Sequence, residues 1–230
     1  MTSEMAFECV LVSSDPAVLR TMDPLLHGFS IQTRICPNPL TIDRVLDQCA
    51  ADLIVIDLES ANYAGVLHRL REDRAKQKPT VLAVSVTDGA VPGVHVLLRK
   101  PVTADSGLKS LTTAYSRMLR DFRAHTRFAL MKSVLASDEN GRTLPLTVTN
   151  IGVGGIGVTT KEKLAIGSSL SFRLVLPELD NAISIRARVL WIRQYGVAGC
   201  EFVHIPAFDT QLLQAWLESR YRIKKPLITI

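Results

Sequence analysis

The spacing of apolar residues changes near residue 120, and this change constrains the fold more than any other feature of the chain. Before it, continuous apolar runs occur at Cys9–Val12, Leu53–Ile56, Val81–Val84 and Val96–Leu98. After it, apolar residues recur at every second position, as in Leu144, Leu146 and Val148. Continuous runs are typical of a parallel sheet covered on both faces, whereas alternation is typical of antiparallel sheets with one buried face. We therefore expect two domains of different fold class, which 230 residues can supply.

Helical spacing separates the apolar runs of the first half. Ile42, Val45, Leu46 and Cys49 lie at i, i+3, i+4 and i+7, and Asp15 precedes Pro16 as a helix cap precedes a first-turn proline. A further strand is expected within Phe29 to Ile35, where apolar residues alternate. The pattern predicts an α/β domain with a doubly wound parallel sheet. The interval from Ser85 to Lys100 is short for a helix, and glycine and proline interrupt it.

The second half predicts a small antiparallel barrel or sandwich. Alternating segments cover residues 144–148, 170–176 and 183–191, and Asn140-Gly141 is a hairpin signal. This alternation favours a core position for Trp191 over the alternative, a platform for base stacking. A helix is expected from Asp209 to Arg222. Before the strands, a helical stripe over residues 108–122 predicts a last helix of the first domain, whose apolar side forms core or a dimer seam.

Charge is distributed unevenly between the two halves. Residues 1–115 hold 11 Lys and Arg against 13 Asp and Glu, whereas residues 116–230 hold 16 against 9. A basic half favours an anionic partner, such as a dinucleotide, a nucleic acid or a membrane surface. No apolar run approaches the roughly 20 residues that span a bilayer, and the start lacks a basic signal region. We expect a cytoplasmic protein with reduced cysteines and no metal site, since Cys9, Cys36, Cys49 and Cys200 are scattered.

Two arginines and a glycine-rich turn are the candidate ligand-binding residues of the basic half. Arg123 and Arg127 lie one helical turn apart, shortly before the segment Asn150-Ile151-Gly152-Val153-Gly154-Gly155. Guanidinium groups bind phosphate with two hydrogen bonds and stack flat on bases. Asn150 offers an acceptor and donors to a base edge, and glycine lets a ligand approach the backbone. Such a set suits a small, doubly anionic ligand that carries purines.

These residues resemble the motifs of PilZ domains, which bind cyclic di-GMP. Arg123 and Arg127 match an Arg-x-x-x-Arg motif, and Asn150 and Gly155 match the ends of Asp/Asn-x-Ser-x-x-Gly, with Gly152 at the usual serine. The resemblance covers roughly residues 117–220. It implies a six-stranded antiparallel β-barrel with a terminal helix, a site formed by Arg123, Arg127, Asn150, Gly152 and Gly155, and cyclic di-GMP as ligand, with no other cofactor. Losing one serine hydrogen bond weakens binding by a few-fold to about tenfold.

The first half resembles a response-regulator receiver domain over about residues 6–120. Asp57 follows the third apolar run, where the family has its phosphoacceptor; Ser85 stands at the switch position, and Lys100-Pro101 matches the family's Lys-Pro pair. The family's acidic pair after the first strand is replaced by Ser13-Ser14. Mg²⁺ binds through carboxylates and offsets the charge of phosphoryl transfer. The loss of the acidic pair therefore predicts a pseudo-receiver that serves docking or dimerisation. Asp57 stays a possible phosphoacceptor.

Together these patterns predict a receiver-like domain over residues 1–118 and a PilZ-like barrel over 119–230. We expect a cytoplasmic bacterial signalling effector, not an enzyme, that binds cyclic di-GMP and relays this to a protein partner, or self-associates through its first domain. The alternative is an interaction adaptor whose barrel binds no nucleotide. A DNA-binding regulator is disfavoured because strands, not a helix-turn-helix, are expected after residue 120. No catalytic triad, metal-ligand spacing or Walker loop supports an enzyme.

Overall fold

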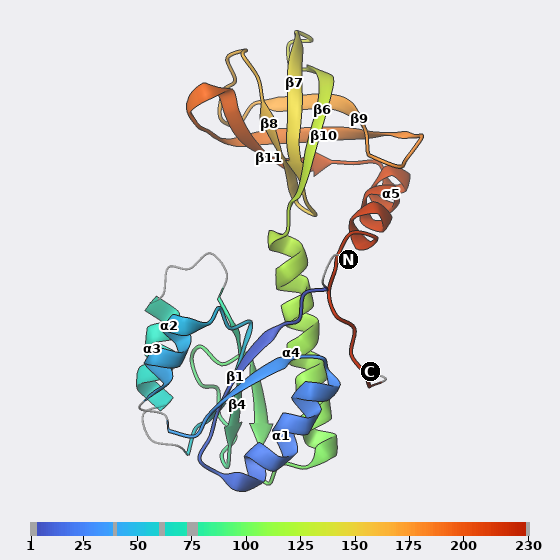
Figure 1. Cartoon of the computed structure of the whole chain (residues 1–230). Helices are drawn as coiled ribbons and strands as arrows, with labels where there is room; N and C mark the ends of the chain where they lie inside the picture. The colour runs from blue at the N-terminus through green and yellow to red at the C-terminus, as the bar shows by residue number, and fades with distance from the viewer. Residues whose placement is uncertain (1–3, 39–40, 60–62, 73–77, 229–230) are drawn as a thin grey trace. The chain divides into compact units, whose positions relative to one another are not determined.

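The computed structural model describes residues 4–38, 41–59, 63–72 and 78–228 (Figure 1). They form two compact units. The first contains the chain up to Asp121 together with the segment from Arg222 onward, and the second runs from Phe122 to Tyr221. Among the residues that the structure describes, no helix combines the length and apolar character needed to cross a membrane.

The first unit is a five-stranded parallel sheet in the order β2-β1-β3-β4-β5. Its elements are β1 (Glu8–Val12), α1 (Pro16–Gly28), β2 (Gln32–Cys36), α2 (Ile42–Gln48), β3 (Leu53–Asp57), α3 (Tyr63–Glu72), β4 (Thr80–Ser85), β5 (Val96–Arg99) and α4 (Ala104–His125), which continues into the second unit. Every residue of β3 and β4 is buried, as the continuous apolar runs predict. The strand order is that of the doubly wound fold found in CheY.

Helices cover both faces of this sheet. In Figure 1, α2 and α3 lie on one side of it, and α1 and α4 on the other. Ile42 of α2 and Val66 of α3 pack in one core cluster with the sheet. On the other side α1 and α4 pack closely. A Cβ added to Gly107 of α4 would lie only 2.7 Å from a methyl carbon of Leu25 in α1. No helix separates β4 from β5, which confirms the prediction from that short interval.

A C-terminal strap, residues 222–228, completes the first unit. Met5 N–H donates to Arg222 O at 2.7 Å, and Lys224 N–H donates back to Met5 O at 2.8 Å. At the end of α1, Leu227 N–H donates to Gly28 O at 2.7 Å, and the Ser30 hydroxyl donates to Lys225 O at 2.6 Å. The last described residues of the chain are therefore part of the α/β unit, not of the barrel that precedes them.

The second unit is a closed barrel in the order β10-β11-β8-β7-β6-β9, with every neighbouring pair antiparallel. Its elements are β6 (Phe128–Ser137), β7 (Thr143–Ile151), β8 (Gly155–Thr159), β9 (Ser169–Val175), β10 (Ala182–Ile192), the 3₁₀ turn η2 (Gln194–Gly196), β11 (Val197–His204) and α5 (Ala207–Glu218). The Asn140-Gly141 hairpin forms as predicted, with Gly141 at φ 76°. This is the expected six-stranded barrel with a terminal helix.

Two details of the barrel differ from the sequence expectation. Helix α5 ends at Glu218, four residues before the predicted end. Trp191 lies on the surface with 42% of its area exposed, so its placement in the core was wrong. The register between β10 and β11 shifts between Val189 and Trp191. Such a bulge interrupts the two-residue alternation and turns the next side chain to the opposite face. The tryptophan of the core is Trp216 of α5, which is 4% exposed.

Candidate functional site

The arginine motif lies where α4 leads into β6. Arg123 is in the last turn of α4, and Arg127 precedes the first residue of β6. The Arg127 Nη1 donates only to the backbone oxygens of Ala124 and Thr126, at 3.2 and 3.3 Å. It has no carboxylate partner within the barrel unit, all of whose residues are described. Its guanidinium is therefore available to an anion.

Arg123 is held by its neighbours in the same unit. Its Nη2 lies 3.1 Å from Glu218 Oε2, and its guanidinium sits 5.8 Å from the centre of the Tyr221 ring. The Arg123 Nε and the Tyr221 hydroxyl are both buried without a hydrogen-bond partner. Burial raises the pKa of Tyr221, and Glu218 adds to this, while Arg123 and Arg127 oppose it. Two orphaned polar groups beside the arginine motif are a feature that a bound anion or water would explain.

The glycine turn meets the arginine motif directly. A Cβ built on Gly152 would collide with Arg127 Nη1 and lie 2.6 Å from the carbonyl oxygen of Thr126. The turn is closed by Gly152 N–H donating to Gly155 O at 2.9 Å, and Gly154 O accepts from Phe202 N–H at 3.1 Å. The structure thus brings Arg127 and Gly152 into contact, the juxtaposition on which the sequence interpretation depends.

The barrel backbone explains why residue 155 is a glycine, and the sequence alone did not reveal this. A Cβ at this position would collide with the carbonyl oxygen of Cys200, where β8 pairs with β11. A side chain is thus excluded by the barrel backbone itself, whether or not a ligand binds.

Asn150 belongs to a row of residues that crosses four strands. Asn150 pairs with Gly157, Gly157 with Gly199, and Gly199 with Trp191, on β7, β8, β11 and β10. The Asn150 side chain covers Gly157, since a Cβ there would lie 2.8 Å from its Cγ, and Trp191 covers Gly199 in the same way. We call these four residues the outer row. Arg193 adds a guanidinium 5.0 Å from the centre of the Trp191 ring.

The outer row faces away from the core. Ile156, Val158, Ala198 and Cys200, which flank its two glycines, all pack inside the barrel. The row therefore presents an amide and an indole on the outer wall, each lying over a glycine. Sequence reasoning found Asn150 but missed Trp191, Gly157 and Gly199. Their signal, two paired glycines on neighbouring strands beside a Trp, becomes visible only with the strand register.

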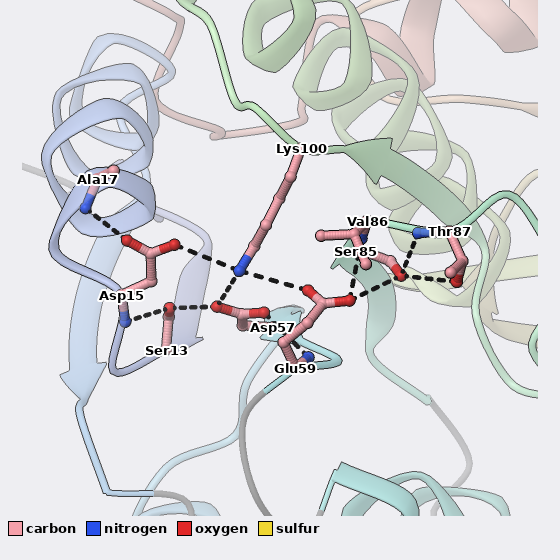
Figure 2. A network of polar contacts seen from close by, with 9 residues as sticks. All are labelled: Ser13, Asp15, Ala17, Asp57, Glu59, Ser85, Val86, Thr87 and Lys100. Atoms are coloured by element: carbon pink, nitrogen blue, oxygen red, sulfur yellow. Dashed lines mark hydrogen bonds and ion pairs between the residues drawn. The ribbon is translucent and has the colours of Figure 1, made fainter.

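A second polar cluster lies at the carboxyl edge of the first unit's sheet, at the predicted phosphoacceptor (Figure 2). Asp57 ends β3 and is 2% exposed. Its Oδ2 accepts hydrogen bonds from the Ser13 hydroxyl at 2.8 Å and Lys100 Nζ at 2.9 Å, and its Oδ1 accepts from Glu59 N–H at 3.1 Å. Both carboxylate oxygens are thus already engaged.

Lys100 lies among three carboxylates. Its ammonium group is 2.9 Å from Asp57 and 3.3 Å from both Asp15 and Glu59 (Figure 2). Burial alone would lower the pKa of Lys100, but its hydrogen bonds to Asp57, Asp15 and Glu59 outweigh burial and raise it. We call Lys100, Asp15, Asp57 and Glu59 the lysine network.

The carboxylates of this network have further partners. The Ala17 N–H, and secondarily Lys100, lowers the pKa of Asp15, which caps α1 as the sequence predicts. Burial would raise the pKa of Glu59, but hydrogen bonds, first from Val86 N–H and also from Ser85 and Lys100, lower it overall. Sequence reasoning did not identify Glu59, or Ser13 as a donor to Asp57.

These residues do not fit the divalent metal that the receiver resemblance implies. In the described ranges, no three His, Cys, Asp or Glu side chains are grouped to hold a metal ion. Ser13 stands where a carboxylate is needed, and the ammonium group of Lys100 contacts all three carboxylates of the network. We therefore derive no phosphoryl-transfer step at this site.

Comparison with known proteins finds a family match in the second half of the chain. Residues 121–219 match the PilZ domain family. A search of curated proteins finds no significant match. Among solved structures, the chain is similar to a CheY-like receiver domain from Methylobacillus flagellatus, with 17% identity, coverage of 50% of this chain and 99% of that chain, and a TM-score of 0.43. The chain is also similar to the chemotaxis response regulator CheY4 of Vibrio cholerae, with 13% identity, coverage of 48% of this chain and 99% of that chain, and a TM-score of 0.42.

A third similar structure is the Bacillus subtilis inhibitor of motility, MotI/DgrA. The identity is 25% and the TM-score 0.36, over 41% of this chain and 48% of that chain, so the similarity spans about half of that protein. The β2-β1-β3-β4-β5 order of the first unit is that of the receiver fold. Residues 121–219 thus match the PilZ domain family, and the α/β domain that precedes them has a receiver-like strand order.

Proposed function

We propose that the chain is a non-enzymatic signalling effector whose PilZ domain binds cyclic di-GMP on the outer wall of the barrel. The contact of Arg127 with the Gly152 turn is the observation that carries this proposal. Arg127 and Arg123 bind phosphate and a guanine edge, and Asn150 contacts a guanine. The partly exposed ring of Trp191, with the Arg193 guanidinium 5.0 Å from its centre, offers a surface for base stacking. Gly152 lets the Arg127 guanidinium lie against the turn, and Gly155 lets β8 pair closely with β11.

Isothermal titration calorimetry with cyclic di-GMP tests this assignment. Each charge-assisted hydrogen bond contributes about 1.5–3 kcal/mol, so Arg127→Ala should weaken binding by roughly ten- to 150-fold. Arg142→Ala is the matched control, because Arg142 is an exposed arginine of the same barrel that pairs with Glu162 outside the motif. Equal affinity of wild type and Arg127→Ala would remove the assigned site, and no heat from either would remove the ligand.

The alternative, an interaction adaptor whose barrel binds no nucleotide, is favoured by the pairing of Arg123 with Glu218. In that case Glu218 permanently occupies the position that a phosphate would take. A thermal shift assay separates the two functions, because a ligand that binds only the folded state raises the midpoint. A midpoint unmoved by cyclic di-GMP supports the adaptor.

We also propose that the receiver-like domain acts through docking or self-association, without phosphorylation of Asp57. The proposal is supported by the engaged oxygens of Asp57 and by the ammonium of Lys100 among the carboxylates. Acetyl phosphate with Mg²⁺, followed by intact-mass spectrometry, tests it with Asp57→Asn as the control. An 80 Da adduct, about the mass of one phosphoryl group, found on wild type and absent from the variant would contradict the proposal.

A further inference from the structure

A hollow of about 500 Å³ lies on the barrel wall, formed by residues of β6, β9, β10 and β11. Its polar lining includes Ser171, Arg173, Ser184, Arg186 and His204, and we call it the arginine hollow. None of these residues belongs to the PilZ motifs. Along β10, Arg186 is five residues from Trp191, which places it roughly 17 Å away. The hollow is thus a separate place on the same barrel.

The strand register explains why these side chains share one face. Ser184 pairs with Arg173, and Arg186 pairs with Ser171 on one side and with His204 on the other. The alternate residues Phe172, Leu174, Ile183 and Ile185 are in the barrel core. Because successive side chains of a strand point to opposite faces, the arginines and serines project outward.

Arg173 and Arg186 form an uncompensated pair of like charges. They are diagonal neighbours across β9 and β10, a position in which long side chains reach one another. Neither forms an ion pair within the fully described barrel unit, whereas Arg142, Arg188 and Arg220 are paired with Glu162, Glu201 and Glu178.

Two acidic side chains of the barrel unit accept hydrogen bonds from backbone N–H groups of β9 and β10. Asp209 accepts a hydrogen bond from Ser184 N–H at 2.8 Å, and Glu139 accepts one from Ser169 N–H at 2.9 Å. The two guanidiniums, which form no ion pair within the barrel unit, thus lie beside the hydroxyl groups of Ser171 and Ser184 in the hollow.

The chemistry of the arginine hollow matches a phosphate group carried on a small organic molecule. Forked guanidiniums bind phosphate oxygens in pairs, and serine hydroxyls donate to the remaining oxygens. The volume lies within the range of small-molecule sites. Leu135 and Pro206 on its lining offer apolar contact for the organic part, and Leu135 is 69% exposed. We propose that the arginine hollow is a second ligand site of the PilZ domain, which binds a small organic phosphate through Arg173 and Arg186.

Titration of the full chain with phenyl phosphate, followed by ¹⁵N NMR, tests this proposal. We expect saturable shifts at the amides of Ser171, Ser184 and His204 at millimolar ligand or below, and weaker binding of inorganic phosphate, which lacks the apolar group. The variant Arg173→Gln/Arg186→Gln should lose at least tenfold in affinity, because two charge-assisted contacts disappear. Arg173→Lys keeps the charge without the fork, and an intermediate loss is expected.

The matched control is Arg142→Gln/Arg188→Gln, which removes the same charge from paired arginines of the same barrel. It should bind phenyl phosphate within about twofold of wild type, a change below the roughly 1 kcal/mol scale of a single contact. An equal loss in both double variants would mean that only net charge attracts the probe, and absence of saturable shifts in wild type would remove the site.

The two barrel sites can be distinguished by titrating the variant of each site with the ligand of the other. Arg127→Ala should leave phenyl phosphate binding unchanged, and Arg173→Gln/Arg186→Gln should leave the cyclic di-GMP titration unchanged. Failure of cyclic di-GMP to bind would therefore not affect the result for the hollow. Loss of phenyl phosphate binding in Arg127→Ala would contradict the separation of the sites.

Discussion

At the scale of single residues, Gly152 shows how a departure from a family motif is compensated locally. The family resemblance implies a serine here that donates to the ligand. In this chain the space of a side chain is filled by Arg127 and by the carbonyl of Thr126. The glycine therefore allows the Arg127 guanidinium to lie directly against the turn.

Gly152→Ser should weaken cyclic di-GMP binding instead of restoring the family contact. The new Cβ would displace Arg127 and press on the backbone at Thr126, which cannot move as a side chain does. We expect a loss of about fivefold or more, equivalent to roughly 1 kcal/mol. Calorimetry measures this, with Gly154→Ser as control because a Cβ there meets nothing within 4 Å. Tighter binding by Gly152→Ser would show that the turn adapts.

Glu218→Gln should strengthen cyclic di-GMP binding. The carboxylate of Glu218 holds Arg123 at 3.1 Å and competes with a phosphate for it. Both partners are about half exposed, so the ion pair contributes up to about 1 kcal/mol and its loss gives up to about fivefold in affinity. The same titration detects the change. The control is Glu178→Gln, which removes the ion-pair partner of Arg220 instead. An unchanged affinity would indicate that Arg123 does not bind the ligand.

Residue identity alone predicted Arg123, Arg127, Asn150, Gly152 and Gly155 as one site, and the structure brings Arg127 and Gly152 together. It could not predict the partners that those residues have without a ligand. Glu218 lies 95 residues from Arg123, and Ser13 lies 44 from Asp57. Contacts between residues so far apart in the sequence depend on tertiary structure, which the spacing of motif residues does not predict.

At the scale of elements, the apolar spacing predicted the parallel strands and β7, β9 and β10 because burial is periodic along each of them, but it did not mark β6, β8, β11 or α3. β10 is the exception that affects the candidate site. Alternation from Ile183 to Val189 extrapolates to an inward Trp191, but the register shift before Trp191 turns its ring outward over Gly199. A bulge depends on the pairing of two strands, so one strand's pattern does not reveal it.

The two tryptophans should therefore respond differently to truncation. Trp216→Ala removes a buried ring that donates to Pro177 O at 2.8 Å and should cost about 3–5 kcal/mol of barrel stability. Trp191→Ala removes an exposed ring and should cost less than about 1.5 kcal/mol, yet weaken cyclic di-GMP binding by one stacking contact, roughly fivefold or more. Urea unfolding and calorimetry measure the two effects. Similar stability losses would place Trp191 among the core residues.

At the scale of the whole molecule, the lysine network makes the stability of the first unit depend on pH from both sides. The lowered pKa values of Asp15 and Glu59 give stability that is present above their ordinary values and lost as pH falls through the folded values. The raised pKa of Lys100 gives stability that is present below its ordinary 10.5 and lost as pH rises through the folded value. The full contribution is thus expected between about pH 5 and 10.

Lys100→Met should destabilise the first unit at pH 7 by about 3 kcal/mol, since it leaves Asp57 buried without its cation. The loss should shrink at pH 4, where protonation of the carboxylates relieves their repulsion. Hydrogen exchange of β3 and β4 peptides reports this unit separately from the barrel. Arg99→Met is the control, because Arg99 pairs with Asp88 on the surface. A pH-independent loss would assign Lys100 a packing role only.

The C-terminal strap gives the molecule an order of assembly. Residues 222–228 complete the first unit, yet the ribosome makes them only after the whole barrel, about 100 residues and roughly 5–20 seconds later. During that interval the backbone groups of Met5 and Gly28 that the strap later pairs face solvent. A nascent α/β domain thus lacks its last segment while the barrel folds, and a chain cut after Tyr221 would keep that unfinished edge permanently.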